Sequence, residues 1–142
     1  MPETDVPVTN PPVEFSRHDN FESLYANNIQ FEASEWDLKI LFGELDLRGG
    51  KVAVEQHTAM NIPWVQAKLL LFYLGVQVAI NEKINGPIRI PKTVLPPEPP
   101  PLPEQFKDNP LALELRAFAD KMRKDFIASL NASGEIAIPH KP

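Results

Sequence analysis

Apolar residues recur every three or four positions between Met60 and Gly86, which predicts one long helix. Asn61 is expected to cap its start, and Pro63 fits the first turn. Gly86 followed by Pro87 is expected to end it. The apolar residues form two faces: Ala67, Leu71, Leu74 and Val78 on one, and Val65, Leu69, Phe72, Val76 and Ile80 on the other. A helix with two apolar faces needs two partners, and we expect one of them to be a sheet.

The stretch from Tyr25 to Ala59 alternates with a period of two, which predicts three strands. The alternating positions are Ile29, Phe31 and Ala33, then Trp36, Leu38, Ile40 and Phe42, then Val52, Val54, Gln56 and Thr58. A loop that contains Gly43 and Gly49-Gly50 is expected before the third strand. This pattern is typical of an antiparallel meander with one packed face. Ile88 and Ile90 allow a short fourth strand.

A second helix is predicted near the C-terminus, with Asn109 as its cap. Its apolar residues form one narrow stripe, which consists of Leu111, Leu115, Phe118, Met122 and Phe126. The segment from Pro91 to Pro103 before it is expected to adopt a polyproline II conformation. Two interpretations of that segment stay open, a semi-rigid spacer or a ligand for a proline-binding module.

The expected fold class is α+β: an antiparallel β-meander of three or four strands covered by one long helix, plus a C-terminal amphipathic helix on a Pro-rich linker. The α+β core is expected over residues 25–91, the linker over 92–109 and the amphipathic helix over 110–131. Residues 1–24 form an acidic, proline-containing tail that we expect to be disordered. Residues 132–142 are expected to form a second tail.

Composition narrows the functional classes. The chain has 142 residues, 16 of them proline, a net charge of −5 and no cysteine. Thiolate metal sites are therefore excluded, and no segment is basic enough to predict nucleic-acid binding. The longest apolar run, Leu69–Leu74, is far shorter than the roughly 20 residues that span a bilayer. Without a secretory signal pattern, the expectation is a cytoplasmic protein with no membrane partner.

Several short motifs occur in a family-like order: Tyr25-Ala26-Asn27, Phe42-Gly43, Met60, Ala67-Lys68 with Leu70 and Leu74, Glu82, and Gly86-x-Ile88. In this order and spacing, residues 25–91 resemble domain of unknown function family 3467, a group of small bacterial and archaeal proteins. Ile62-Pro63-Trp64 departs from the usual serine-proline helix start, and Asn81 stands where an aromatic residue is common. The resemblance implies the order of the elements and no catalytic residues.

Few residues suggest chemistry. His18, His57 and His140 are too scattered to form a ligand set by spacing. His57 and Glu55 alternate on one strand face, where a metal or acid/base pair competes with an ordinary solvated surface. Glu32, Glu35 and Asp37 cluster at the first hairpin, where exposed acids are common and paired carboxylates for acid/base work are the alternative. We expect no catalytic residue, metal or cofactor.

Gly75 lies in the middle of the predicted long helix, where glycine costs about 1 kcal/mol relative to alanine. Close approach of another backbone would explain it. In an antiparallel pair of copies centred on Gly75, Lys68 would approach Glu82, and two independent exposed charges are the alternative. The candidate partner-binding residues are Phe72, Gly75, Val76 and Ala79 on this helix, and Leu111, Leu115, Phe118, Met122 and Phe126 on the C-terminal one.

The sequence favours a non-catalytic interaction or accessory protein that forms a homo-oligomer through its long helix. The C-terminal helix would dock on its own core, on a sister subunit or on another protein. One alternative is a small chaperone-like binder of unfolded or apolar segments, which predicts exposed apolar surface. The other is a small enzyme, which predicts a deep pocket with perturbed titratable groups.

Overall fold

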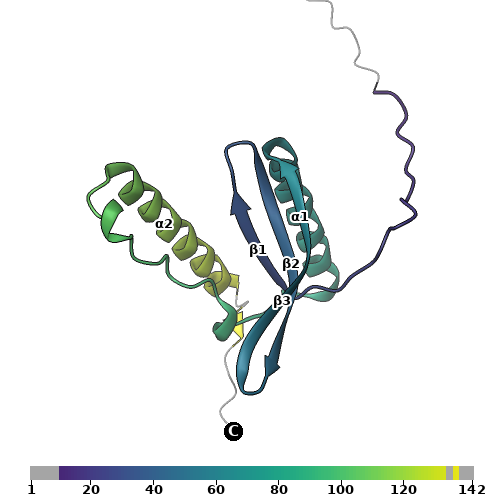
Figure 1. Cartoon of the computed structure of the whole chain (residues 1–142). Helices are drawn as coiled ribbons and strands as arrows, with labels where there is room; N and C mark the ends of the chain where they lie inside the picture. Colours follow the sequence, from purple (N-terminus) through teal and green to yellow (C-terminus); the bar gives the residue numbers. More distant parts are fainter. Residues whose placement is uncertain (1–9, 134–135, 138–142) are drawn as a thin grey trace, which may run out of the picture. The chain divides into compact units, whose positions relative to one another are not determined.

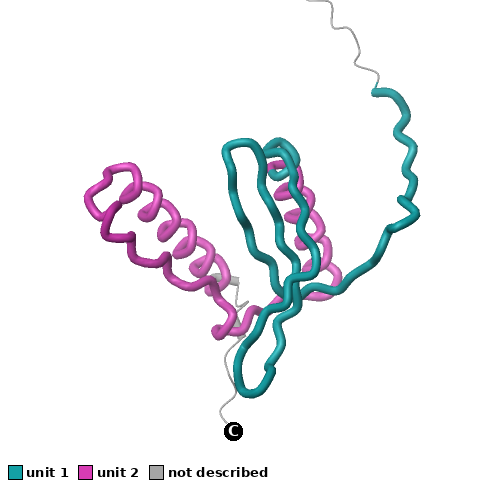
Figure 2. Tube along the Cα trace, viewed as in Figure 1, with its two compact units in different colours: residues 1–67 teal, residues 68–142 magenta. Residues whose placement is uncertain are grey.

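The computed structural model describes residues 10–133, 136 and 137. The chain divides into two compact units, residues 1–67 and residues 68–142 (Figure 2). The first unit contains a three-stranded sheet, and the second contains the C-terminal helix (Figure 1). The outer ends of the two predicted tails lie outside the described residues.

The sheet is an antiparallel meander in the order β1-β2-β3 (Figure 1). Its strands are β1 (Asn28–Ala33), β2 (Asp37–Arg48) and β3 (Lys51–Pro63), and α1 (Trp64–Asn85) and α2 (Pro110–Ser133) follow. The predicted α+β fold, with a meander, a long helix and a C-terminal helix, is confirmed. That the long helix covers the sheet stays a prediction.

The expected fourth strand does not join the meander. The chain forms β4 (Ile90–Pro91), which pairs in parallel with β5 (Ile136–Ala137) in a separate two-stranded sheet. This pairing joins the start of the proline-rich segment to the chain that follows α2. It therefore connects the two ends of the segment that contains the C-terminal helix, and the fourth strand belongs to the same unit as this helix.

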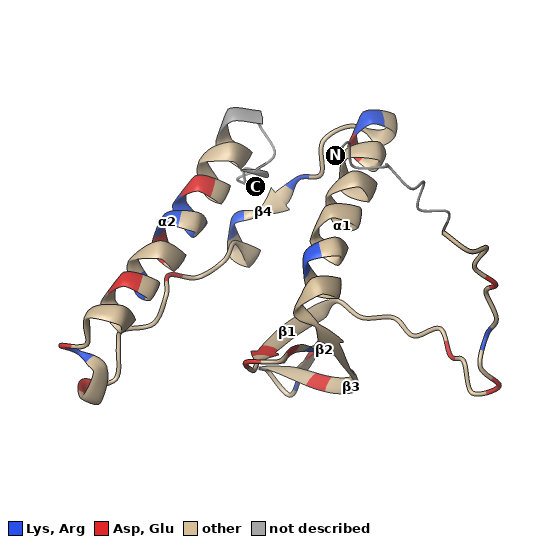
Figure 3. Ribbon diagram, turned by 90° about the horizontal axis from the view of Figure 1, so that it is seen from above, with Lys and Arg blue, Asp and Glu red and all other residues tan. Residues whose placement is uncertain are grey.

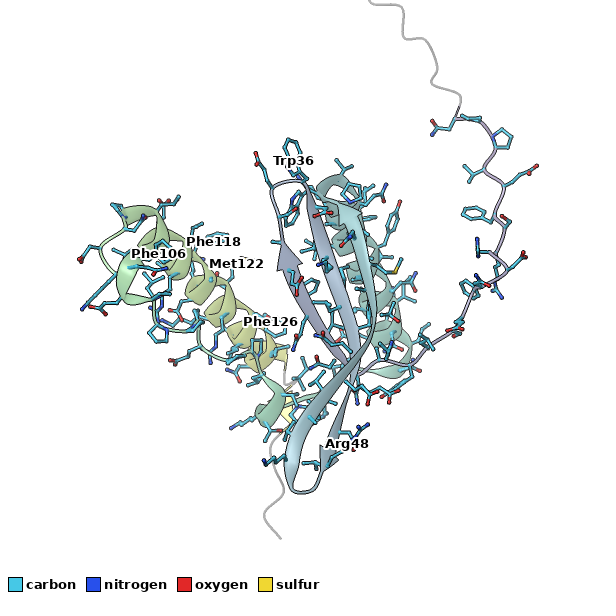
Figure 4. The ribbon with its side chains drawn as sticks, viewed as in Figure 1. Trp36, Arg48, Phe106, Phe118, Met122 and Phe126 are labelled. Carbon is cyan, nitrogen blue, oxygen red and sulfur yellow. The ribbon has the colours of Figure 1, made fainter. Side chains whose placement is uncertain are left out.

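The second and third strands are longer than predicted, because the expected loop at Gly43 is absent and β2 continues through this residue to Arg48. The only turn between β2 and β3 is Gly49-Gly50, with φ angles of 57° and 76°. Two consecutive positive φ values are typical of a two-residue hairpin turn, which matches the twist of the flanking strands. Trp36, expected in the second strand, precedes it in the β1–β2 turn and is exposed (Figure 4).

A β-bulge at His57 lets β2 continue past Gly43. Phe42 pairs with Thr58 and Gly43 pairs with Gln56, so His57 has no opposite residue on β2. The strands come so close here that a Cβ atom on Gly43 would lie 2.6 Å from the backbone oxygen of Glu55. Only glycine fits at this position without a backbone shift, which explains why a residue disfavoured in strands stands inside one.

At the bulge, the apolar positions change to the other face of the sheet. In the half of the sheet that contains β1, paired apolar side chains share one face: Ile29, Phe31, Leu38, Ile40, Phe42, Met60 and Ile62. In the distal hairpin the apolar residues lie on the opposite face: Leu45, Leu47, Val52 and Val54. An extra residue in one strand shifts its alternation by one position, so a sequence pattern of unbroken period two places the β3 valines on the wrong face.

Replacing Gly43 by alanine is expected to lower the free energy of unfolding by about 1–3 kcal/mol, since the added methyl group forces apart two paired strands. The measurement is chemical denaturation of the full chain followed by circular dichroism. Glu44→Ala is the matched control, because the neighbouring side chain is exposed and its change should stay within about 0.5 kcal/mol. Equal stabilities of the two variants would contradict the close approach at the bulge.

The long helix begins later than predicted. Met60–Pro63 belongs to β3, where Asn61 pairs with Lys39 and therefore is not the helix cap. Pairing with β2 satisfies the backbone groups that a first helical turn would leave without partners. At the start of α1, Trp64 Nε1 donates a hydrogen bond of 3.1 Å to the Ser34 carbonyl in the β1–β2 turn, so the indole anchors the helix start.

The far end of α1 follows the prediction. Gly86 has a φ of 88°, and its backbone N–H donates to the Glu82 carbonyl at 2.9 Å. A glycine with positive φ is the usual residue at this position of a helix end. The Glu82 carboxylate also accepts a hydrogen bond of 3.1 Å from the Ile88 N–H. Glu82 therefore has a local structural role in addition to the predicted pairing with Lys68 of a second copy.

Candidate interaction surfaces

The candidate residues on α1 all lie on its surface. Phe72 is 63% exposed, and Val76 and Ala79 are exposed as well. No residue of α1, from Trp64 to Asn85, is buried. A Cβ atom placed on Gly75 would meet no atom within 4 Å, so nothing within the described chain explains this glycine. What binds this surface stays a prediction.

The charges of α1 are confined to its two ends (Figure 3). Lys68 lies in the first turns and Glu82 and Lys83 in the last, whereas residues 69–81 contain no charged side chain. By length and composition alone, α1 is apolar enough to cross a membrane. The longest uninterrupted apolar run, Leu69–Leu74, is much shorter than the stretch that could span a bilayer. A spanning helix tolerates interspersed Gln, Asn and Gly among its apolar residues, so the whole helix has to be considered.

The proline-rich segment packs along α2, which differs from the expected free spacer (Figure 1). Arg116 donates hydrogen bonds of 3.0 Å to the Pro100 carbonyl and 3.2 Å to the Pro99 carbonyl. Arg123, two turns further along the helix, donates one of 2.8 Å to the Pro96 carbonyl. The segment and the helix therefore run antiparallel. A polyproline II segment has no internal hydrogen bonds, so its carbonyls are free to accept from the two arginines.

Packing against the proline-rich segment uses one face of α2. The less exposed helix residues on this face are Ala112, Asp120, Arg123, Ile127 and Leu130. Leu130 is 4% exposed, and its methyl groups therefore belong to the small core of this unit. Pro99 and Leu102 of the segment are half-buried. One side of the proline-rich segment thus contacts the chain itself, which makes binding to a proline-recognition module less favourable.

The predicted apolar stripe of α2 lies on a different face and is exposed. Phe118 is 60% and Met122 is 58% exposed, and Figure 4 shows both on the side of α2 away from the proline-rich segment. The other members of the stripe, Leu111, Leu115 and Phe126, are exposed too. The start of α2 also follows the prediction, since Asn109 Oδ1 accepts a hydrogen bond of 3.1 Å from the Ala112 N–H.

Charged side chains of α2 pair along the helix. Lys121 pairs with Asp125, and Lys124 pairs with Asp120, each one turn apart. The hydrogen bond from Lys124 holds the pKa of Asp120 below its ordinary value. Individually, these exposed pairs contribute little to stability. They do hold the charged side chains in defined positions around the helix, next to the apolar stripe.

His57 has a structural environment. Its Nε2 lies 2.8 Å from the Tyr25 carbonyl, to which it donates, and its Nδ1 lies 2.8 Å from the Thr58 hydroxyl. Glu55, its expected neighbour, instead pairs with Arg48 at 2.9 Å. Within residues 10–133 and 136–137, no three histidine or acidic side chains are grouped to hold a metal. The bulge explains why the expected alternation of Glu55 and His57 fails.

Two of the three acids at the first hairpin, Glu32 and Asp37, have structural partners. Glu32 pairs with Lys39 at 2.9 Å and raises the pKa of that lysine. The Ser34 hydroxyl donates a hydrogen bond of 2.5 Å to the Asp37 carboxylate and accepts bonds from the N–H groups of Trp36 and Asp37. These contacts build the turn between β1 and β2. They therefore favour the ordinary interpretation of the three acids over acid/base work.

Asn27 has a role that the sequence pattern did not single out. Its side-chain oxygen accepts a hydrogen bond of 2.6 Å from the Leu45 N–H, and its amide nitrogen donates one of 3.3 Å to the Leu45 carbonyl. The side chain thus takes the place of a strand residue and extends the pairing of β1 with β2 beyond Gly43. Asn27 belongs to the motif Tyr25-Ala26-Asn27 at the start of the first strand, but this motif does not identify a partner 18 residues away.

One open hollow near the start of α2 measures about 390 Å³. It is lined by Pro101, Leu102, Glu104, Lys107, Leu113 and Arg116. Its charged groups already have partners, since Lys107 pairs with Glu104 at 3.3 Å and the guanidinium of Arg116 donates to proline carbonyls. The hollow therefore offers no group poised to act on a substrate.

Comparison of the chain with known proteins found no matching family model, curated protein or solved structure. The resemblance to domain of unknown function family 3467 stays a prediction from the short motifs.

Proposed function

We propose that this protein is a non-catalytic interaction or accessory protein that forms a homo-oligomer through α1. The observation that carries the proposal is the exposure of both apolar faces of this helix. Phe72 on one face and Leu74 on the other are each more than half exposed in the single chain. Large contiguous apolar surfaces of this kind mark sites of association.

The energetic argument rests on the size of the exposed side chains. Fully burying one large apolar side chain contributes about 1.5–3 kcal/mol. The helix has 22 residues, and its central turns lack charged groups that would favour water. Several such side chains together offset the entropy that two chains lose on association. A second copy supplies an equally apolar helix and is always present at the same concentration.

Gly75 supports a close, antiparallel crossing of two α1 helices. Open space surrounds this residue in the single chain, so a second backbone can approach where a side chain would obstruct it. The same crossing brings Lys68 of one copy toward Glu82 of the other. Glu82 accepts one hydrogen bond from the Ile88 N–H, and a carboxylate has further lone pairs for an ammonium group.

Two rival roles use the same apolar surface. A chaperone-like protein would bind unfolded segments, and the exposed valines and leucines of the distal β2–β3 hairpin favour this alternative. A membrane role would insert α1 into a bilayer, for which it is long enough. Only residues 69–81, between Lys68 and Glu82, are uncharged, which is about 20 Å of helix against a hydrocarbon core of about 30 Å. Insertion would therefore place a charged group in hydrocarbon, where it is costly. Both alternatives give distinct outcomes in the experiment that follows.

Replacing Gly75 by leucine is expected to weaken self-association of the full chain at least ten-fold, because the bulky side chain separates the two helices. In the isolated chain leucine is a better helix former by nearly 1 kcal/mol, so helix content should not fall. The measurements are sedimentation equilibrium and circular dichroism. Gln77→Leu is the matched control, since it places the same side chain about 160° away around the helix.

Equal association constants for the two variants and the natural chain would contradict the crossing at Gly75. A monomeric natural chain that suppresses aggregation of an unfolded test protein would favour the chaperone-like role. A natural chain that co-sediments with neutral phosphatidylcholine vesicles would favour the membrane role. Either result would replace the proposed homo-oligomer.

A further inference from the structure

We infer that the apolar stripe of α2 is a second self-association surface, which binds the α2 helix of another copy in antiparallel orientation. The stripe consists of Leu111, Leu115, Phe118, Met122 and Phe126 and is separate from the surface of α1. This surface goes beyond the proposed association through α1 and does not depend on it.

The packing of the proline-rich segment decides which face of α2 is available. Arg116 and Arg123 hold that segment against one side of the helix, and this side is therefore occupied. The apolar stripe lies about 120° away around the helix and stays exposed. From Leu111 to Met122 its members are spaced by four, three and four residues, which is the spacing of a two-helix seam.

The charges beside the stripe match a second copy in antiparallel orientation. Glu114 and Lys121 are one heptad apart and lie on the same side of the seam. When Leu115 of one helix packs beside Phe118 of the other, the two-fold axis falls between positions 116 and 117. Glu114 of each copy then lies beside Lys121 of its partner. The two pairs are equivalent by symmetry, so the surface is self-complementary.

A parallel arrangement lacks this complementarity. With the helices parallel, residues flanking the seam meet those about five positions further along the other chain. Glu114 would then lie beside Ala119, and Lys121 would lie beside Phe126. Neither charge would gain an opposite charge on the partner. The antiparallel orientation is therefore favoured by both residues at once.

The helix α1 is a poorer occupant of this surface. Its charges are confined to the ends: Lys68 lies about 21 Å from Glu82 along the helix axis, and Lys83 lies only about 1.5 Å beyond Glu82. Glu114 and Lys121 on α2 are only about 10 Å apart. One α1 helix therefore cannot offer an opposite charge to each of them. Lys121 already pairs with Asp125 on its own helix, and its ammonium group has donors for a second carboxylate.

Charge reversal tests the surface directly in the full chain. Glu114→Lys and Lys121→Glu should each weaken self-association roughly ten-fold at low salt, because each puts two pairs of like charges side by side. An equimolar mixture of the two variants should regain the association of the natural chain, since lysine then faces glutamate at both pairs. Sedimentation equilibrium measures the dissociation constants, and circular dichroism verifies that the helix content is unchanged.

Lys124→Glu is the matched control. It breaks a one-turn pair with Asp120 of the same kind that Lys121→Glu breaks, but Lys124 lies about 160° around the helix from the apolar stripe, whereas Lys121 flanks it. Its association constant should equal that of the natural chain. A mixture that stays as weak as each variant alone, or a control that weakens association equally, would overturn the antiparallel α2 pairing.

The experiment also separates this surface from that of α1. Gly75→Leu changes only the surface of α1, and the recovery on mixing depends only on charges of α2. Recovery on mixing with no effect of Gly75→Leu would support the α2 surface and refute association through α1. An effect of Gly75→Leu with no recovery on mixing would refute the α2 surface alone.

Discussion

Replacing Ile40 by alanine is expected to lower the free energy of unfolding by about 2–5 kcal/mol. Ile40 is only 6% exposed and lies on the central strand of the meander, between Phe31 on β1 and Met60 on β3. Removing three carbon atoms there leaves a cavity that the paired strands cannot close without losing hydrogen bonds. Urea denaturation of the full chain, followed by tryptophan fluorescence, measures the loss.

Ile29→Ala is the matched control for Ile40→Ala. Ile29 shares the same sheet face but lies on the edge strand, where it is 52% exposed. Its replacement should cost less than half as much as the replacement of Ile40. Comparable losses at the two positions would mean that a further surface covers the sheet and buries Ile29, and would contradict the exposed position of Ile29 at the sheet edge.

Replacing Leu130 by alanine is expected to have a similarly large effect, about 2–5 kcal/mol, on the unit formed by α2 and the proline-rich segment. Leu130 is 4% exposed and lies on the helix face that holds Arg123 and Ile127. Losing this side chain removes the buried apolar contact that supplements the arginine–carbonyl hydrogen bonds. The segment before α2 should consequently detach more readily. Limited proteolysis at Lys107 and thermal unfolding by circular dichroism measure the change.

Leu115→Ala is the control for Leu130→Ala, because Leu115 is on the same helix, is 58% exposed and does not line the hollow that contains Lys107. It should lower stability by well under half as much and leave cleavage at Lys107 unchanged. Faster cleavage in both variants would indicate that the helix itself is destabilised, and would contradict the assignment of Leu130 to the contact with the proline-rich segment.

The packing of the proline-rich segment changes the meaning of its composition. As a free spacer it would place α2 at a variable distance from the rest of the chain. With Arg116 and Arg123 bonded to its carbonyls, it supports one side of α2 over several turns. The helix then presents a defined apolar stripe, and less conformational entropy is lost when a partner binds.

Local patterns were sufficient for the elements themselves. Period two over residues 25–59 predicted strands, and a period near 3.6 over residues 60–86 and 110–131 predicted helices, because each backbone conformation places apolar side chains on one side at its own spacing. The Asn109 cap and the Gly86 helix end depend only on neighbouring residues. The candidate partner-binding residues on both helices were likewise identified as apolar stripes, and the structure leaves them exposed.

The bulge and the helix start required knowledge of the paired strand. His57 has no opposite residue on β2 because Gly43 allows Glu55 to approach closely. Gly43 and Glu55 are 12 positions apart in the sequence. Asn61 is a good helix cap by its own chemistry, but its pairing with Lys39 continues the strand past it. Local propensity loses to a ladder of backbone hydrogen bonds that a partner strand completes.

By itself, the sequence determined the order of strands and helices, the capping of α2 and the apolar surfaces of the two helices, since these depend on spacing within one element. The tertiary structure decided the face switch of the sheet at His57, the role of Asn27 and the attachment of the proline-rich segment to α2. Each of these arises from contacts between residues distant in sequence, such as Arg123 with Pro96 and Asn27 with Leu45. Such contacts depend on where folding brings the backbone, and no local period encodes that position.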